Sequence, residues 1–333
     1  MQPSISTPHL LAVCGLLSVS AMAADYDPLT VPKTEAAKPL ELTVTDAKRS
    51  REIPLRVYSP TATQPAPVVM FSHGLGGTRE GSVFLGQHWA ARGYVAVFLQ
   101  HPGSDDAIWK GQPLGQRARA MQTAASAENF VLRVADVPAV LDQLTRWNTE
   151  SDHPLKGRLD LTRVGMSGHS FGAVTTQAVS GQALPLGSQP LTDSRIKAAI
   201  IMSPSLPKAG TAEQAFGQVK IPWLLMTGTH DLARIGGQTI GAADMASRLG
   251  VYPALPAGGK YEVVLNEARH FVFTDRPELA GEGPRNPNHH RAILALSTAF
   301  WDAYLKQDAA AKEWLDGLGP RTILEKEDRW QRK

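Results

Sequence analysis

From about residue 40 to residue 304, short apolar runs alternate with amphipathic stretches along this chain. The continuous apolar runs at 68–71 and 94–99 are typical of strands buried on both faces of a parallel sheet. Residues 40–45 and 53–58 alternate apolar and polar side chains instead, which predicts an antiparallel pair at a sheet edge. Further strands are predicted in the run before residue 168 and at 196–202, 223–226 and 261–265.

Helices are predicted at 84–91, 128–147 and 293–304. The stretch 128–147 has the clearest helical periodicity, since apolar residues recur every three or four positions along it: Val131, Val134, Val137, Leu141 and Leu144. Alternation of strands and helices predicts an α/β fold with a mostly parallel central sheet and helices on both faces. No repeat or second domain is visible, so residues 40–333 are interpreted as a single domain.

Composition and charge narrow the classes of protein that fit. A length of 333 residues with 43% hydrophobic residues suits one large α/β domain. The net charge of +3 is small, and the basic residues are scattered along the chain. A nucleic-acid partner is therefore not expected.

The first 23 residues differ from the rest. They contain no Asp, Glu, Lys or Arg, and residues 10–19 form an apolar run too short to span a bilayer. Ala21-Met22-Ala23 then supplies a small-x-small cleavage site. We interpret residues 1–23 as a signal peptide that lacks the usual basic start, which predicts a secreted or periplasmic protein without stable membrane insertion.

Residues 24–39 are predicted to form a mobile leader after this segment. The chain's only cysteine, Cys14, lies within residues 1–23, so removal of that segment leaves a protein without cysteine. Disulfides, cysteine catalysis and thiolate metal sites are excluded in such a mature protein.

The candidate chemistry centres on Gly168-His169-Ser170-Phe171-Gly172, a G-x-S-x-G pattern. It lies between an apolar run and a helix-compatible stretch at 173–179. In a strand–turn–helix of this kind the serine stands on a strained turn, which exposes its Oγ. Glycines are needed on both sides because a Cβ there would collide with neighbouring elements. Ser170 is therefore the candidate nucleophile.

A glycine-rich turn, residues 72–77, follows the strand predicted at 68–71. Such a turn can direct a backbone N–H into a site, and a serine hydrolase needs two donors for its oxyanion. The amides of Leu75 and Phe171 are the candidate donors. The alternative is that the turn is only a connection between a strand and a helix. It is not a phosphate loop, because no Gly-Lys-Ser/Thr follows.

Two further residues complete a possible triad. Asp231 follows the strand at 223–226, and His270 follows the strand at 261–265. A carboxylate past a strand end can orient a histidine and stabilise its imidazolium, although an aspartate there can also cap a helix or turn. The order Ser170, Asp231, His270 along the chain is that of α/β-hydrolases.

Irregular segments near these residues are candidates for the pocket wall. Trp109 lies in the segment 101–116, and Phe271 and Phe273 follow His270 directly. We expect no metal and no cofactor, since adjacent His289 and His290 lack the four-residue spacing of a paired zinc site. No long hydrophobic lid helix is evident, which favours short-chain or soluble esters.

The segments Phe71-Ser72-His73-Gly74-Leu75-Gly76-Gly77 and 168–172 resemble the oxyanion loop and nucleophile turn of platelet-activating-factor acetylhydrolases. Over about 40–304 the chain resembles an α/β-hydrolase of the dienelactone hydrolase and acetylhydrolase-like group. The resemblance implies Ser170 as nucleophile, with Leu75 and Phe171 as backbone oxyanion donors.

The resemblance departs at the acid. In the acetylhydrolases the aspartate follows the strand after the nucleophile helix, where this chain has Ser203-Pro204-Ser205. Asp231 lies one strand later, as in dienelactone hydrolases and bacterial cutinase-like polyesterases. This difference bears on the phospholipid substrate more than on the triad.

The function predicted from these residues is a serine carboxylic ester hydrolase that forms an acyl-enzyme on a small-molecule ester, as a monomer or weak oligomer. Three alternatives stay open: a lipase or cutinase-like polyester hydrolase, an acyltransferase, and a non-catalytic binding protein on a hydrolase scaffold.

Overall fold

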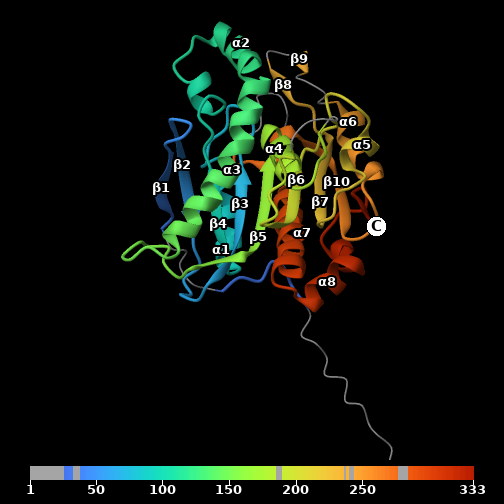
Figure 1. Ribbon diagram of the computed structural model, residues 1–333. Helices are drawn as coiled ribbons and strands as arrows, with labels where there is room; N and C mark the ends of the chain where they lie inside the picture. Colours follow the sequence, from blue (N-terminus) through green and yellow to red (C-terminus); the bar gives the residue numbers. More distant parts are fainter. Residues whose placement is uncertain (1–25, 33–37, 185–189, 236–237, 240–243, 277–283) are drawn as a thin grey trace, which may run out of the picture.

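The computed structural model describes residues 26–32, 38–184, 190–235, 238–239, 244–276 and 284–333. It has an α/β architecture built on a nine-stranded sheet in the order β1-β2-β4-β3-β5-β6-β7-β10-β11 (Figure 1). The strands are β1 (Leu40–Asp46), β2 (Arg51–Tyr58), β3 (Ala66–Ser72), β4 (Val95–Leu99), β5 (Leu159–His169), β6 (Ile196–Met202), β7 (Trp223–His230), β10 (Lys260–Arg269) and β11 (Arg329–Arg332).

The six strands from β4 to β10 in this order are parallel to one another, β2 and β11 pair antiparallel with β4 and β10, and β1 pairs antiparallel with β2. The mostly parallel sheet and the antiparallel edge pair are therefore confirmed. Parallel strands bring their carboxyl ends to one edge of the sheet, where ligands bind in open α/β sheets. The loops after β3, β5, β7 and β10 meet at this edge.

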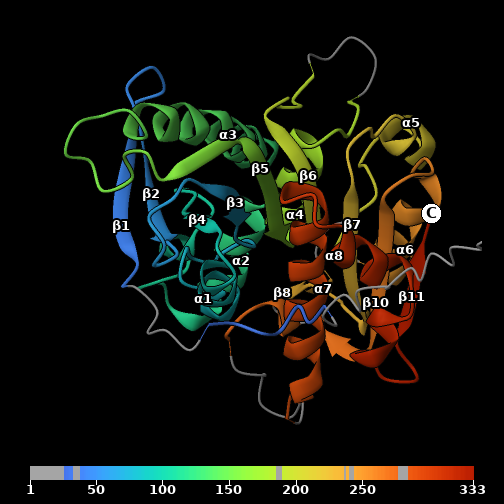
Figure 2. The same ribbon diagram turned by 90° about the horizontal axis from the view of Figure 1, so that it is seen from below.

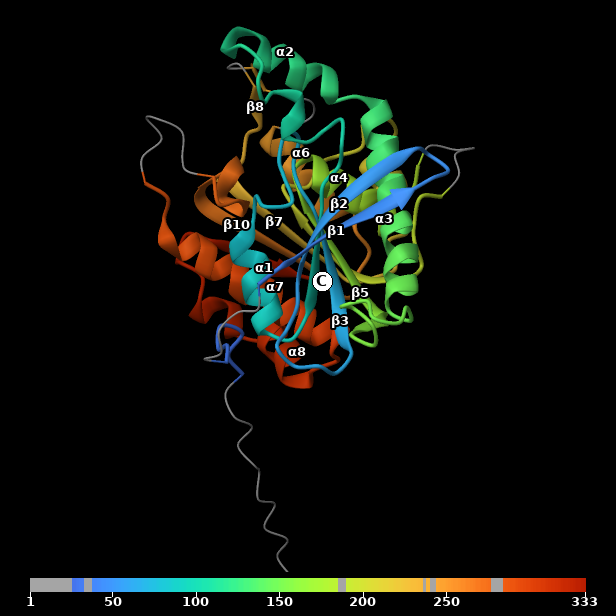
Figure 3. The ribbon, with the colours of Figure 1, turned by 90° about the vertical axis from the view of Figure 1, so that its left-hand side faces the viewer.

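Helices cover both faces of the sheet, as Figures 2 and 3 show. One face packs against α1 (Val83–Ala91), α7 (Pro287–Leu305) and α8 (Ala309–Asp316). The other packs against α3 (Ala127–Trp147), α4 (Phe171–Val179), α5 (Ala212–Phe216) and α6 (Met245–Ala254). The helix α2 (Leu114–Ala124) lies beyond the carboxyl edge, near the short pair β8 (Arg234–Ile235) and β9 (Gln238–Thr239). Three short 3-10 turns complete the fold: η1 (Asp106–Ile108), η2 (His270–Phe273) and η3 (Gly319–Thr322).

The predicted elements are present with small changes in their bounds. The helix predicted at 293–304 begins earlier, at Pro287, because Asn286 caps it and proline suits the first helical position. The pattern missed the helices α2, α5, α6 and α8 and the strands β8, β9 and β11. These elements are short or lack a continuous apolar run.

The predicted core face of α3 needs one correction, at Val131. This side chain is 60% exposed, whereas Val134, Val137, Leu141 and Leu144 are buried. At about 100° per residue, Val131 lies about 100° from the centre of the stripe formed by the other four. Val131 precedes Val134 by three residues and so fits the helical spacing, but it lies outside the buried face of α3.

The N-terminal predictions are tested only in part. Residues 1–23, interpreted as a signal peptide, lie outside the described residues. Within the leader, residues 26–32 pack against the body of the protein, since the Tyr26 hydroxyl donates to Asp302 at 2.8 Å and Arg92 donates to the Thr30 carbonyl at 2.6 Å. In the part of the chain that the structure describes, no helix is long and apolar enough to cross a bilayer.

Candidate active site

Ser170 occupies a sharp turn between β5 and α4. Its backbone has φ +58° and ψ −114°, a conformation that is strained for a residue with a Cβ. A Cβ built on Gly168 would lie 2.3 Å from the Gly172 carbonyl oxygen, and one on Gly172 would lie 1.8 Å from the Ser72 carbonyl oxygen. The strand–turn–helix predicted around Ser170 is present, and both glycines are sterically required.

Ser170, His270 and Asp231 form one hydrogen-bonded chain. The His270 Nε2 lies 2.9 Å from the Ser170 Oγ, and the His270 Nδ1 lies 2.6 Å from the Asp231 Oδ1. Asp231 follows β7 and His270 opens η2 after β10, so three separate strand ends contribute one residue each. The structure thus brings together the three residues that the sequence singled out.

Asp231 is fully buried and held by more than the histidine. Its Oδ2 accepts from the Thr227 hydroxyl at 2.8 Å, and its Oδ1 lies 3.5 Å from the Nε of buried Arg248. Burial alone would raise the pKa of Asp231, but the charge of Arg248 and the interaction with His270 hold it below its ordinary value. The carboxylate is therefore ionised and accepts a hydrogen bond from the N–H of His270 Nδ1.

Leu75 lines the same cavity as Ser170 and His270. The carbonyl of Gly74, in the peptide unit that carries the Leu75 N–H, accepts from His73 Nδ1 at 2.6 Å and from the Gly77 amide at 3.0 Å. The peptide is trans, so the Leu75 N–H points away from these two donors. The loop thus fixes the direction of the Leu75 amide.

The Phe171 amide lies at the first position of α4, immediately after Ser170. Amides at a helix start have no partner within the helix, and the helix dipole gives them partial positive charge. Among the described residues, neither this amide nor that of Leu75 has a hydrogen-bond acceptor in the protein. Both are available to an oxyanion next to Ser170.

The cavity in front of Ser170 is small, with a volume of about 40 Å³. Its apolar wall contains Phe71, Leu75 and Phe271. Sequence reasoning did not single out Arg276, which also lines it and donates to the Gly76 carbonyl at 2.6 Å. The only sequence signal for Arg276 is its place in the segment after the histidine.

The three predicted substrate contacts differ in their placement. Phe271 lines the cavity. Trp109 does not, since its Nε1 donates to the Gly76 carbonyl at 2.8 Å and thereby braces the loop that carries Leu75. Phe273 is fully buried in the core, 5.5 Å from the ring of His169, because η2 turns residues two apart to different sides.

A second hydrogen-bonded set of Ser, His and Asp lies behind the glycine-rich loop at 72–77. The Ser72 Oγ is 2.9 Å from His101 Nε2, and His101 Nδ1 is 2.8 Å from Asp136 Oδ2. All three side chains are fully buried, and none lines the cavity in front of Ser170. Geometry alone would assign two triads, but only the chain ending at Ser170 opens to a substrate.

No protein-family model matches this chain, and no curated protein matches it at a significant level. In the described ranges, no group of three or more His, Cys, Asp or Glu side chains is placed to hold a metal ion. What the site does is therefore inferred from its geometry and chemistry.

Proposed function

We propose that this chain has an α/β-hydrolase fold of the dienelactone hydrolase and acetylhydrolase-like group and hydrolyses carboxylic esters through Ser170. The observation that carries the proposal is the hydrogen-bonded chain from Ser170 through His270 to buried Asp231, next to an open cavity. The strained turn at Ser170 and the order of the three residues along the chain support it further.

In the first half-reaction His270 Nε2 takes the proton of Ser170 as its Oγ attacks the ester carbonyl carbon. The carbonyl π electrons move to the oxygen, which accepts hydrogen bonds from the Leu75 and Phe171 amides. Asp231 stabilises the imidazolium that forms. When the tetrahedral intermediate collapses, the alcohol leaves with the proton from His270, and the acyl group stays on Ser170.

In the second half-reaction a water molecule gives its proton to His270 and attacks the acyl carbon. The same two amides hold the second oxyanion. Collapse returns the proton to Ser170 and releases the carboxylic acid, so the enzyme ends as it began.

A short-chain or soluble ester is the substrate class that the cavity supports. Its volume of about 40 Å³ is far below the roughly 300–1,000 Å³ usual for ligand sites, which leaves room for a small acyl group rather than a long chain. Phe71, Leu75 and Phe271 give it an apolar wall suited to a small acyl group. Residues 1–23 lead us to propose in addition that the enzyme is exported.

The test is hydrolysis of p-nitrophenyl esters from acetate to palmitate, with Ser170→Ala measured alongside. We expect a serine-dependent rate that falls as the acyl chain lengthens. A rate that rises with chain length would favour a lipase or polyester hydrolase, and ester products formed with an added alcohol would favour an acyltransferase. Near-wild-type hydrolysis by Ser170→Ala would refute the assignment.

A further inference from the structure

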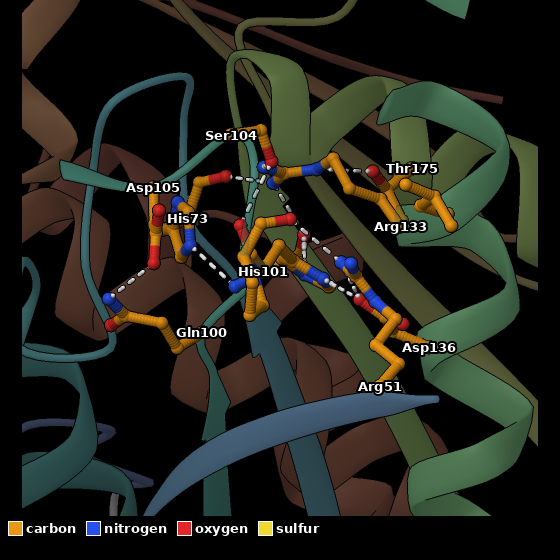
Figure 4. Close-up of polar contacts among 12 residues, drawn as sticks. Arg51, His73, Gln100, His101, Ser104, Asp105, Arg133, Asp136 and Thr175 are labelled. Atoms are coloured by element: carbon orange, nitrogen blue, oxygen red, sulfur yellow. Dashed lines mark hydrogen bonds and ion pairs between the residues drawn. The ribbon is translucent and has the colours of Figure 1, made fainter. Parts of the chain in front are cut away.

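Arg133, on α3, is the centre of the polar network behind the site (Figure 4). It is fully buried, and each of its three nitrogens donates a hydrogen bond. The Nη2 donates to the carbonyl of His73 and to the Ser72 hydroxyl at 3.0 Å, the Nη1 to the Ser104 hydroxyl at 2.9 Å, and the Nε to the Thr175 hydroxyl at 3.2 Å.

These contacts join the two segments that supply the oxyanion amides. His73 is two residues before Leu75 in the glycine-rich loop, and Thr175 lies on α4, the helix that begins at Phe171. The guanidinium carbon also lies 4.7 Å from the centre of the Phe171 ring. The planar fork of an arginine can hold partners in several fixed directions at once, which an ammonium group cannot.

The charge of Arg133 has no direct ion-pair partner among the described residues. The nearby carboxylate, Asp136, accepts instead from His101 at 2.8 Å and from Arg51 at 2.7 and 2.9 Å. Burial and the charge of Arg133 lower the pKa of His101 to about 4, so this histidine is neutral at pH 7. Within the described ranges, no carboxylate is hydrogen-bonded to the guanidinium, and its positive charge lies against the loop and the start of α4.

His73 shows how tightly the loop is held. Its Nδ1 donates to the Gly74 carbonyl at 2.6 Å, which sets the direction of the Leu75 amide, and its Nε2 accepts from the His101 amide at 3.1 Å. Because Arg133 donates to the His73 carbonyl, the backbone of this residue is fixed as well as its ring.

We propose that Arg133 is a positioning residue of the oxyanion site, which clamps the Leu75 loop to the start of α4 and places a buried positive charge behind both amides. The inference rests on the proposed hydrolase function, because it concerns a charge that forms only in that reaction. Donors held in place before the reaction stabilise the transition state more than the bound substrate, so their loss lowers kcat rather than raising KM.

The variants Arg133→Met and Arg133→Lys test the clamp, with Arg146→Met as the matched control on the exposed side of the same helix. Removing one oxyanion donor costs about 10²–10³ in kcat, so we expect about a 100-fold loss for methionine, which lacks both fork and charge. Lysine keeps the charge without the fork, and we expect about a 10-fold loss on the same scale. KM should change less than about threefold.

A trifluoromethyl ketone, which forms a tetrahedral adduct with the serine, supplies the readout that separates positioning from stability. Its inhibition constant should rise in each variant by the same factor as kcat falls, whereas a merely structural role would lower the melting temperature and leave that constant unchanged. If Arg133→Met does not fold, kcat and the inhibition constant of Arg133→Lys test the proposal instead.

Wild-type kcat and unchanged inhibition in a folded Arg133 variant would overturn the proposal. Failure of the hydrolase assignment would look different. Wild-type enzyme would then show no Ser170-dependent hydrolysis before any change at Arg133, and the premise of the inference would fall with it.

Discussion

Replacing Asp231 by asparagine changes one oxygen of the proposed triad and little of its shape. In the wild type the ionised Oδ1 lies 2.6 Å from His270 Nδ1, so that nitrogen carries the proton and Nε2 is free to accept from Ser170. An asparagine can present its NH₂ group to Nδ1 instead. The imidazole proton then moves to Nε2, where it blocks proton transfer from the serine.

The expected loss follows from charge and tautomer. At about 4 Å and an effective dielectric constant of about 20, a carboxylate stabilises an imidazolium by about 4 kcal/mol. Together with the wrong tautomer, the missing charge should lower kcat by about 10⁴-fold, which corresponds to about 5.4 kcal/mol. Arg248 keeps its hydrogen bonds to the Ser203 and Pro204 carbonyls. The substitution should therefore lower the free energy of unfolding by less than the about 3–5 kcal/mol expected for a broken buried ion pair.

The assay is the kcat for p-nitrophenyl acetate with the Ser170→Ala rate subtracted, together with urea unfolding. Asp142→Asn, which removes an exposed carboxylate from the outer side of α3, is the control and should keep wild-type kcat. A folded Asp231→Asn enzyme that retains more than about a tenth of the activity would refute the role assigned to this carboxylate, since the lost charge and the wrong tautomer together should cost about 10⁴-fold.

The remaining predictions concern the fold that holds the site. Gly172→Ala should prevent stable folding or abolish activity, because its Cβ would lie 1.8 Å from a backbone oxygen; soluble, active protein would contradict this. Val131→Lys should change the free energy of unfolding by no more than about 0.5 kcal/mol, whereas Val134→Lys should destabilise strongly; equal effects in urea would show the helix face to be wrongly assigned. Burial lowers the pKa of His101 and of His290 to about 4, so the unfolded chain binds more protons between pH 4 and 6.5 and stability should rise with pH across that window. His290→Gln should flatten the rise, and an unchanged slope in urea titrations would count against the assignment.

Residues whose role depends on their position at a strand end could be predicted from the sequence. Ser170, Asp231 and His270 each follow a recognisable apolar run, and parallel strands bring such ends to one edge. The glycines around Ser170 added a steric requirement that the structure bears out.

The Arg133 network could not be predicted in this way. The hydrogen-bond partners of Arg133 lie 29 to 61 residues from it in sequence, and no spacing relates a serine on one strand to an arginine on a distant helix. One signal was present, since Arg133 borders the apolar stripe of α3, where a buried charge calls for partners.

Two of the three predicted substrate contacts lie away from the cavity for a related reason. Phe271 and Phe273 both follow His270 within three residues, but the 3-10 turn directs Phe271 to the cavity and Phe273 to the core. Trp109 lies in the segment expected to form the wall, yet its indole N–H is used to brace the loop. The direction of a side chain in an irregular segment depends on packing partners that are distant in sequence, so neighbouring residues do not predict it.

The central claim is that Ser170, and no other serine, is the activated nucleophile. Labelling the intact protein with a fluorophosphonate and mapping the adduct by peptide mass spectrometry tests this directly, because two Ser-His-Asp sets occur among the described residues and, of these two, the one at Ser170 opens to solvent. The adduct should lie on Ser170 and be absent from His270→Ala. An adduct on Ser72, or a folded protein that does not label at all, would contradict the account.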